Sequence, residues 1–577
     1  MAVLSFSSEH EAGATIVHDG KVLAAVNEER FSRVKNQDGF PHRSIESVLK
    51  IAGIASADIE HVIIPEISKF EDFLKNVILK YPATIFSRGG SKFPGVSDAL
   101  KQMLMSSYIV SKAYLRVGLE HYMDYQRLKR MFPRARFHRV EHHLAHASAP
   151  YFTCRHDKAL IISSDYWGDF ACVMVSIAQG KKLQVVSRSY FPHSPGHYYA
   201  SITKWMGFRA NRHEGKIVGL AAYGDAESPA YDEIKDMFIC DGLKIFAPFM
   251  IGKMWHHKMP VFKNCMMKRL KERYSREDLA AVFQRRFEEV FVELVRNCVN
   301  KYHIENVLLV GGSFANVKLN QRVFEVDGIK NIYVFPNMSD GGISAGAALN
   351  YDVCENGGDR DCLQDVYFGP AFSEREMEDA LDEQRLTYTH ERDIEKKIAK
   401  LLMNKKVVAR FDGRMEFGPR ALGNRSILYT AEDPTVNDWL NKKLKRTEFM
   451  PFAPVTLNDH AHECYENLSG AEYTASFMTI TFDCTDYMKK ASPATVHVDG
   501  TARPQLISKE QNPGYFRILE EYYKLTGIPS IINTSFNMHE EPIVCSPRDA
   551  VRSFMQGHLD YLAMGHYLVD LNEQRKN

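Results

Sequence analysis

The sequence predicts an α/β protein made of two duplicated lobes followed by a second α/β domain. Residues 2–27 have the pattern of three short strands separated by polar turns, and the same succession returns at residues 159–188. Helical patterns and a further strand follow each set. A repeated unit of this kind indicates a duplicated lobe, although two hairpins can also resemble one another by coincidence.

Two lobes of β-meander and helices are typical of the actin-like ATPases, in which nucleotide lies between the lobes. We therefore assign residues 1–350 to a duplicated actin-like domain. Residues 351–365 read as a Gly-containing linker, and residues 366–577 form the second domain.

Composition excludes several classes of function. The 577 residues carry a formal net charge of only +1, which gives no global field for nucleic acid or an anionic membrane. The start lacks the features of a signal peptide, and no apolar run approaches the ~18 residues needed to span a bilayer. The ten cysteines are scattered without a C-x-x-C pair. We expect a reduced, cytoplasmic protein that binds neither nucleic acid nor membrane.

Two histidines stand one helical turn apart within Glu141–Ala147. On a helix, His142 and His146 would share one face, where two neutral imidazoles can bind a divalent metal. Carboxylates that could complete such a site follow later apolar segments, at Asp165 and Asp340. The alternative is that the histidines form a polar stripe on a surface helix.

Two double glycines follow predicted strands in the second lobe and precede helical segments. Glycine lets backbone amides approach phosphate or ribose, and a helix N-terminus adds partial positive charge. Neither stretch matches G-x-G-x-x-G or a Walker A sequence, and plain tight turns are the alternative. The candidate nucleotide-binding residues are Gly311, Gly312, Asn316, Gly341 and Gly342.

Basic side chains recur at the ends of apolar strands in the second domain. Planar guanidinium groups suit bidentate capture of phosphate or carboxylate, so this recurrence favours an anion pocket over ordinary surface solvation. The candidates are Arg414, Arg420, Arg425, Lys445, Arg503 and the nearby Asn533.

With these motifs assembled, the chain resembles the O-carbamoyltransferases of antibiotic and nodulation-factor biosynthesis over nearly its whole length. The matching stretches include Glu141–His146, Ser339–Gly342, Phe411–Arg425, His497–Gln505 and Asn533–Asn537. The resemblance implies an N-terminal actin-like domain similar to the universal tRNA threonylcarbamoyl transferase. It also implies a C-terminal domain similar to YrdC.

The resemblance further implies a reaction in two steps. The YrdC-like domain would bind carbamoyl phosphate and, with Mg-ATP, form carbamoyladenylate. The actin-like domain would hold this intermediate on a metal and pass the carbamoyl group to a hydroxyl of a small natural-product acceptor. A homodimer is expected from the resemblance alone.

The resemblance also implies roles for single residues. His142, His146, Asp165 and Asp340 would bind the metal, for which iron is expected first and manganese or zinc next. His10 would be the general base on the acceptor hydroxyl, and Lys35 would contact the activated intermediate. The basic residues of the second domain and Asn533 would bind carbamoyl phosphate.

One departure from the family pattern concerns the acceptor. The family usually has Asp-Gly-x-Gly-Glu where this chain has Asp165-Tyr166-Trp167-Gly168-Asp169, so two bulky rings stand in this loop. Two other functions are kept as alternatives. The actin-like lobes alone would allow a sugar or acyl kinase, and a nucleotide-controlled binding module would need no catalysis.

Overall fold

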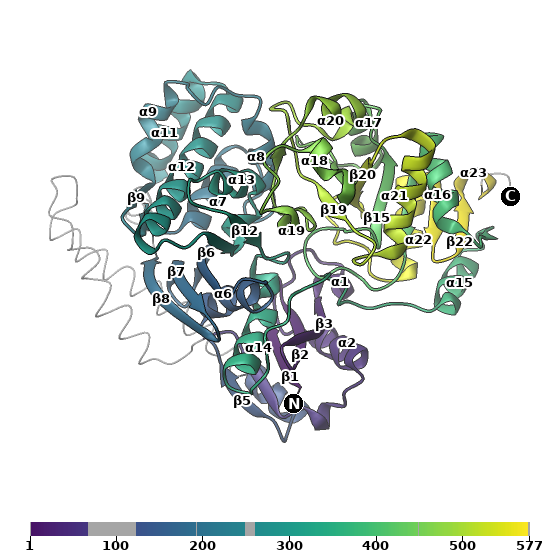
Figure 1. Cartoon of the computed structure of the whole chain (residues 1–577), viewed down its shortest axis with the longest axis horizontal. Helices are drawn as coiled ribbons and strands as arrows, with labels where there is room; N and C mark the ends of the chain where they lie inside the picture. The colour runs from purple at the N-terminus through teal and green to yellow at the C-terminus, as the bar shows by residue number, and fades with distance from the viewer. Residues whose placement is uncertain (1, 67–122, 192, 248–259, 448, 575–577) are drawn as a thin grey trace.

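The computed structural model describes residues 2–66, 123–191, 193–247, 260–447 and 449–574 (Figure 1). The first lobe contains a five-stranded sheet in the order β3-β2-β1-β4-β5. Strand β1 pairs antiparallel with β2 and parallel with β4. The strands are β1 (Val3–Ser7), β2 (Gly13–His18), β3 (Lys21–Asn27), β4 (His61–Ile64) and β5 (Arg136–Arg139).

The second lobe repeats this sheet. Its order is β12-β11-β6-β7-β8, and β6 pairs antiparallel with β7 and parallel with β11. Order and strand directions therefore match those of the first lobe, which confirms the predicted duplication. The strands are β6 (Lys158–Gly168), β7 (Ala171–Gln179), β8 (Lys182–Tyr190), β11 (Asn306–Val310) and β12 (Asn331–Val334).

Helices α6 (His142–Phe152) and α14 (Ile343–Cys354) pack against each other between the two sheets (Figure 1). A Cβ atom at Gly346 would lie 1.9 Å from the carbonyl oxygen of Ala145, so only glycine permits this close approach. Helix α14 continues to Cys354, so the first four residues of the predicted linker 351–365 are helical.

The C-terminal domain is built on an eight-stranded mixed sheet in the order β13-β22-β21-β14-β15-β20-β16-β19. Successive residues of a strand face opposite sides, so Ile531 and Ile532 belong to different hydrophobic clusters. The strands are β13 (Thr389–His390), β14 (Val408–Phe411), β15 (Arg425–Thr430), β16 (Ala453–Leu457), β19 (Gln505–Ile507), β20 (Ser530–Ser535), β21 (Tyr561–Met564) and β22 (Tyr567–Asp570).

Helices cover both faces of this sheet. Helices α16 (Ile394–Met403) and α21 (Pro513–Thr526) contribute to one cluster, and α15 (Glu374–Glu383) and α22 (Pro547–Gly557) contribute to the other. The α/β fold class is thereby confirmed in both domains. Further helices of the N-terminal domain are α2 (His42–Ala52), α7 (Pro195–Trp205), α8 (Glu214–Ala221), α12 (Arg276–Tyr302) and α13 (Val317–Phe324), and its 3-10 turns include η5 (Gly312–Ala315) and η6 (Asp340–Gly342).

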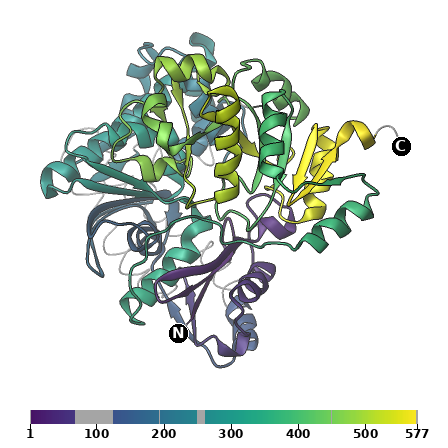
Figure 2. The ribbon, with the colours of Figure 1, turned by 45° about the vertical axis from the view of Figure 1, so that its right-hand side comes forward.

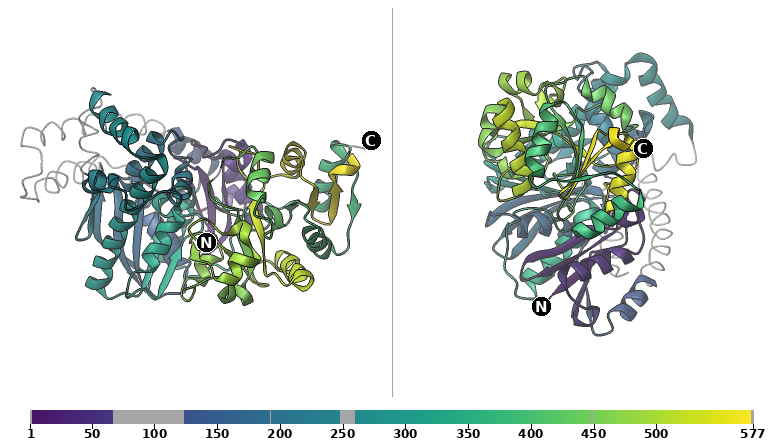
Figure 3. Two further views of the ribbon diagram at one scale, coloured as in Figure 1. Left: turned by 90° about the horizontal axis from the view of Figure 1, so that it is seen from above. Right: turned by 90° about the vertical axis from the view of Figure 1, so that its right-hand side faces the viewer.

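The C-terminal domain lies against both lobes (Figure 2). Arg33 of the first lobe donates from Nη1 to the carbonyl of Ile543 at 2.7 Å, and Lys216 of α8 donates to Thr447 Oγ1 at 2.8 Å. Figure 3 shows that the C-terminus lies at the end of the molecule away from the second lobe. No helix among the described residues is both long and apolar enough to cross a membrane.

Candidate active site

The N-terminal end of α6 presents the histidine pair. The carboxylate of Glu141 accepts a hydrogen bond from Leu144 N at 2.8 Å, and Asp169 Oδ2 accepts one from His142 N at 2.8 Å. Two amides that a helix start leaves unsatisfied are thus capped. The rings of His142 and His146 are both buried, with centroids 4.8 Å apart.

Two carboxylates reach this pair from distant segments. Asp165 follows a point where the ladder between β6 and β7 is interrupted, and the strand bulges there. Its Oδ2 lies 3.2 Å from Nε2 of His146. Asp340 begins η6, and its Oδ1 lies 3.2 Å from His146 Nε2 and 3.4 Å from His142 Nε2. One ligand atom from each of the four residues lies within 4.8 Å of the others.

The electrostatics of this cluster favour positive charge. Burial disfavours a charged imidazole, but the neighbouring Asp340 carboxylate raises the pKa of His142 to about 10. Burial also opposes ionisation of Asp340, yet the two imidazoles hold its pKa well below the usual range. A divalent cation would take the place of these protons on the ligand atoms.

Two buried atoms of the cluster have an ion-pair neighbour but make no hydrogen bond to any described residue. Within the described residues, Nε2 of His142 and Oδ2 of Asp165 are buried and make no hydrogen bond. Buried polar atoms normally have a hydrogen-bond partner, and both of these atoms belong to the same group of candidate metal-ligand atoms. Two imidazoles and two carboxylates suit iron, manganese or zinc, so the four predicted ligands fit a metal ion.

The residues around each histidine distinguish the candidate metal ligands His142 and His146 from His143. A Cβ atom at Gly168 would lie 2.0 Å from Cδ2 of His142, so the absence of a side chain there gives the ring its space. His143 is also buried, but its Nδ1 lies 2.6 Å from Ser163 Oγ. Burial and the two neighbouring imidazoles hold the pKa of His143 well below its ordinary value. It is therefore a neutral packing residue.

The cluster forms part of the wall of a cavity of about 1550 Å³ that both domains line. Eleven predicted site residues line it: His10, Lys35, His142, Asp165, Gly312, Asn316, Asp340, Gly341, Arg420, Arg503 and Asn533. Six do not, namely His146, Gly311, Gly342, Arg414, Arg425 and Lys445. His146 still belongs to the metal cluster, because its Nε2 lies 3.2 Å from carboxylate oxygens of Asp165 and Asp340.

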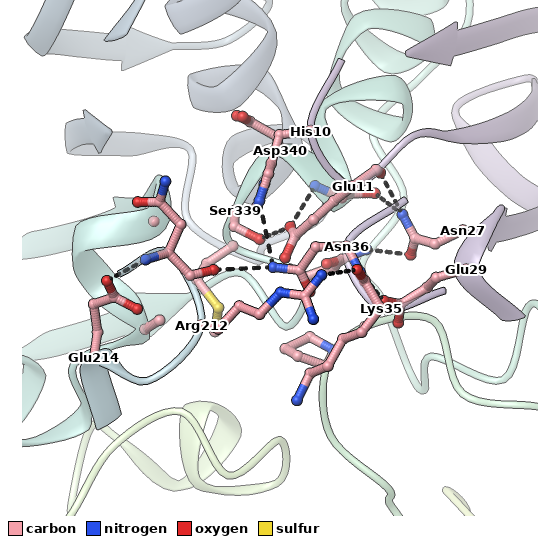
Figure 4. Close-up of a pocket in the computed structure, with 18 of the residues that line it drawn as sticks. His10, Glu11, Asn27, Glu29, Lys35, Asn36, Arg212, Glu214, Ser339 and Asp340 are labelled. Carbon is pink, nitrogen blue, oxygen red and sulfur yellow. Dashed lines mark hydrogen bonds between the residues drawn. The ribbon is translucent and has the colours of Figure 1, made fainter. Parts of the chain in front are cut away.

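His10 and Lys35 occupy the first-lobe side of the cavity (Figure 4). His10 is exposed to solvent, and its Nε2 lies 3.3 Å from Nδ2 of Asn36. The backbone carbonyl of Lys35 accepts a hydrogen bond from Arg212 Nη2 at 2.9 Å. Their catalytic roles stay predictions.

Three predicted nucleotide-binding residues have clear structural tasks. Gly311 has φ +99°, and a Cβ atom there would lie 2.2 Å from the carbonyl oxygen of Ser164. A Cβ atom at Gly342 would lie 2.0 Å from the carbonyl oxygen of Asn337. Asn316 caps α13 by accepting from Leu319 N at 3.1 Å. Contact of these residues with nucleotide stays a prediction.

The C-terminal basic residues divide into two groups. Arg425 is fully buried and donates to backbone carbonyls, among them Asp412 at 2.6 Å. Arg414 donates from Nη2 to the carbonyls of Phe368 and Leu23, at 2.7 and 3.0 Å. Both guanidinium groups therefore hold the backbone together, away from the cavity. Lys445 is exposed, whereas Arg420 and Arg503 line the cavity.

Several cavity residues were absent from the predicted set. Arg446, adjacent to Lys445, lines the cavity, as does Lys216 of α8. Lys216 lies on a helix next to Gly215, and its approach to Thr447 of the second domain depends on tertiary packing. Glu11 and Asn27 also line the cavity and give no sequence signal of their own.

Comparison with known proteins agrees with this combination of fold and site. The carbamoyltransferase N-terminus model matches residues 3–349, and the carbamoyltransferase C-terminus model matches residues 399–571. The chain belongs to the carbamoyltransferase family, which makes it a transferase enzyme.

Relatives extend over almost the entire chain. Uncharacterized protein MJ1051 of Methanocaldococcus jannaschii is 32% identical over 98% of this chain and 99% of its own length. Nodulation protein NolNO of Sinorhizobium fredii is 30% identical over 97% of this chain and 79% of its own length. The match to the C-terminal domain is a feature that neither the kinase nor the binding-module alternative explains.

Proposed function

We propose that this protein is an ATP-dependent O-carbamoyltransferase that activates carbamoyl phosphate as carbamoyladenylate and carbamoylates a hydroxyl of a small natural-product acceptor. The observation that carries the proposal is the shared cavity. The candidate metal ligands His142, Asp165 and Asp340 line it from the first domain, and Arg420 and Arg503 line it from the second. An intermediate made at the arginines could thus reach the metal cluster without leaving the protein.

The arginine side suits the first step. Guanidinium groups bind phosphate through two parallel hydrogen bonds and stabilise the negative charge of the reacting groups. Asn533 adds an amide whose Nδ2 is bonded to Gln505 Oε1 at 2.7 Å, while its Oδ1 has no hydrogen-bond partner among the described residues. That buried oxygen could accept a hydrogen bond from the NH₂ of a carbamoyl group.

The metal side suits the transfer step. A bound divalent metal would polarise the acyl phosphate and neutralise charge on the leaving group. We propose iron, manganese or zinc for this role, held by His142, His146, Asp165 and Asp340. His142, His146 and Asp165 are buried, whereas Asp340 is partly exposed, so the cluster is held by packing and still faces the cavity.

His10 is proposed to accept the proton of the acceptor hydroxyl. The hydroxyl oxygen then bonds the carbamoyl carbon as the bond from that carbon to the phosphate oxygen breaks and AMP leaves. Histidine suits this transfer because its unperturbed pKa of about 6.5 lies near neutrality. Lys35 is proposed to contact the intermediate and balance its phosphate charge.

The first step can be measured without knowing the acceptor. The metal-loaded protein should release pyrophosphate from ATP, together with the inorganic phosphate that leaves carbamoyl phosphate when its bond to the carbamoyl carbon breaks, only when carbamoyl phosphate is present. Arg420→Ala should abolish this release, whereas His10→Ala should retain it. Formation of ADP in place of pyrophosphate would identify a kinase and refute the proposal.

The second step is tested by mass spectrometry of candidate acceptors. A mass gain of one carbamoyl group is expected with the parent protein and not with His10→Ala. Equal loss of pyrophosphate release in both variants would contradict the assigned division between the domains.

A further inference from the structure

Glu11 occupies an unusual place in the wall of the cavity. It lies in the turn between β1 and β2, next to His10, and its backbone has φ +59°. A residue other than glycine adopts this left-handed backbone conformation at an energetic cost, and such residues are often found at functional sites. The carboxylate points across the cleft toward Ser339 and Asp340 (Figure 4).

Both hydrogen bonds of the Glu11 carboxylate end on residues that flank Asp340. Oε2 accepts one hydrogen bond from Ser339 Oγ and another from Gly341 N, the latter at 3.0 Å. Asn27 supports the same turn, because its Nδ2 donates to the carbonyl of Gly341 at 3.0 Å. The turn is therefore held from the first lobe on both sides of the candidate ligand.

The turn that carries Asp340 connects the two lobes, so the hydrogen bonds that hold it affect the position of Asp340. It joins β12, in the sheet of the second lobe, to α14, which packs on the sheet of the first lobe. Asp340 thus lies on a connection between the two lobes. Among the ion pairs of the described residues, its carboxylate takes part only in those with His142 and His146 of α6. Its orientation depends on what fixes the neighbouring backbone.

We propose that Glu11 is a positioning residue that holds Asp340 in its metal-binding orientation and fixes it relative to the adjacent His10. This inference rests on the proposed metal site. Glu11 would act through the backbone of Ser339 to Gly341 and would not bind the metal.

The two hydrogen bonds give the proposal a specific signature. Both end on a single oxygen, so the amide oxygen of Gln could accept both, while Ala accepts neither. Ser339→Ala removes one bond and leaves the strained turn at Glu11 unchanged. Metal affinity should therefore decrease in the order parent, Glu11→Gln, Ser339→Ala, Glu11→Ala.

The test measures Mn²⁺ binding to the protein. The electron paramagnetic resonance signal of the ion reports how much Mn²⁺ stays free. Loss of residues that orient a metal ligand typically costs about 10–100-fold in affinity, so Glu11→Ala should weaken Mn²⁺ binding at least about 10-fold. The Mn²⁺ affinity of Glu11→Gln should stay within about threefold of that of the parent. A threefold change corresponds to roughly 0.7 kcal/mol, because a tenfold change corresponds to about 1.4 kcal/mol.

Asp352→Ala is the matched control. Asp352 lies near the other end of α14, is buried, and accepts a hydrogen bond from Gly20 N at 2.6 Å. Its loss should lower thermal stability without changing Mn²⁺ affinity.

The outcomes distinguish the positioning role of Glu11 from the existence of the metal site. Unchanged Mn²⁺ affinity in Glu11→Ala and Ser339→Ala would overturn the role of Glu11 while leaving the metal site intact. Absence of Mn²⁺ binding by the parent would overturn the metal site and the positioning role together. If Glu11→Ala does not fold, unchanged affinity in Ser339→Ala still overturns the proposal.

Discussion

Nε2 of His146 lies 3.2 Å from Oδ1 of Asp340, although 194 positions separate the two residues in the sequence. Asp165 Oδ2 lies at the same distance from that nitrogen. A buried imidazole between two carboxylates needs a positive charge for balance, either a proton or a metal ion. Metal binding is therefore the first property to test.

Replacing His146 with Ala should weaken Mn²⁺ binding by more than about 100-fold, because a ligand is lost and not merely its support. The neighbouring His143 provides the comparison, since it is equally buried but bonded to Ser163. His143→Ala should lower the melting temperature and leave the affinity unchanged. Isothermal titration calorimetry and thermal unfolding measure the two effects, and equal loss of affinity in both variants would contradict the ligand assignment.

Gly168→Ala should impair the same site by steric displacement. The added Cβ atom would lie 2.0 Å from the ring of His142, so the imidazole must leave its present position 3.4 Å from Asp340 Oδ1. We expect Mn²⁺ affinity to fall about 10-fold or more, as for other changes that misplace a ligand. Gly215→Ala is the control because a Cβ atom there has no neighbour within 4 Å. A titration with unchanged affinity for both variants would rule out this steric role.

Arg425 and Arg420 should respond differently to substitution, although both lie in one motif. Arg425→Met would remove one donor from each of four backbone carbonyls, of which those of Pro370 and Asn424 also accept from backbone amides. Since an unsatisfied buried group costs about 1–3 kcal/mol, we expect a loss of roughly 3 kcal/mol or more in unfolding free energy.

Arg420→Ala should instead lose pyrophosphate release with little change in stability, because Arg420 lines the cavity. Urea unfolding followed by circular dichroism measures the first effect, and a pyrophosphate assay measures the second. A stable Arg425→Met protein would show that these carbonyls are satisfied in another way.

The contact between Glu540 and the second lobe should depend on pH. Its Oε1 lies 2.8 Å from His213 Nε2. Burial alone would raise the pKa of Glu540, but the hydrogen bond and charge of His213, with Lys35 and His539, lower it from 4.5 to about 2. A depressed folded-state pKa contributes stability above pH 4.5, and this contribution is lost as the pH falls toward 2.

The test compares the parent with Glu540→Gln in urea unfolding. The stability difference should be present at pH 5 and should decrease as the pH falls below about 4.5. A double variant with His213→Gln should add little further loss, because the two side chains share one interaction. A difference that grows as the pH falls would contradict the sign of the shift.

Local patterns in the sequence were sufficient for the strands and the duplicated lobes. Short apolar runs and the polar turn residues between them depend on near neighbours, so residues 2–27 and 159–188 could be interpreted without the rest of the chain. The His142 and His146 pair could be recognised for the same reason, since helical spacing alone places them on one face.

Arg414 and Arg425 show where local patterns fail. A Gly/Pro-broken segment with several arginines is the same string of residues whether the guanidinium groups face a ligand or the backbone of their own domain. The turn that follows β14 directs Arg425 onto Phe411, with its guanidinium carbon 3.8 Å from the ring centroid, and Arg420 into the cavity. Arg446 was missed because it lies one position from Lys445 on a segment whose side-chain directions only packing fixes.

The sequence by itself determined the class of fold, the repeat of the lobes and the residue types of the candidate site. Only the tertiary structure decided which of those residues meet. Glu11, His146, Asp165 and Asp340 come from four separate segments, and their approach depends on how α6 and α14 pack between the two sheets. Long-range approach of this kind is set by the burial of whole faces, to which no single local pattern corresponds.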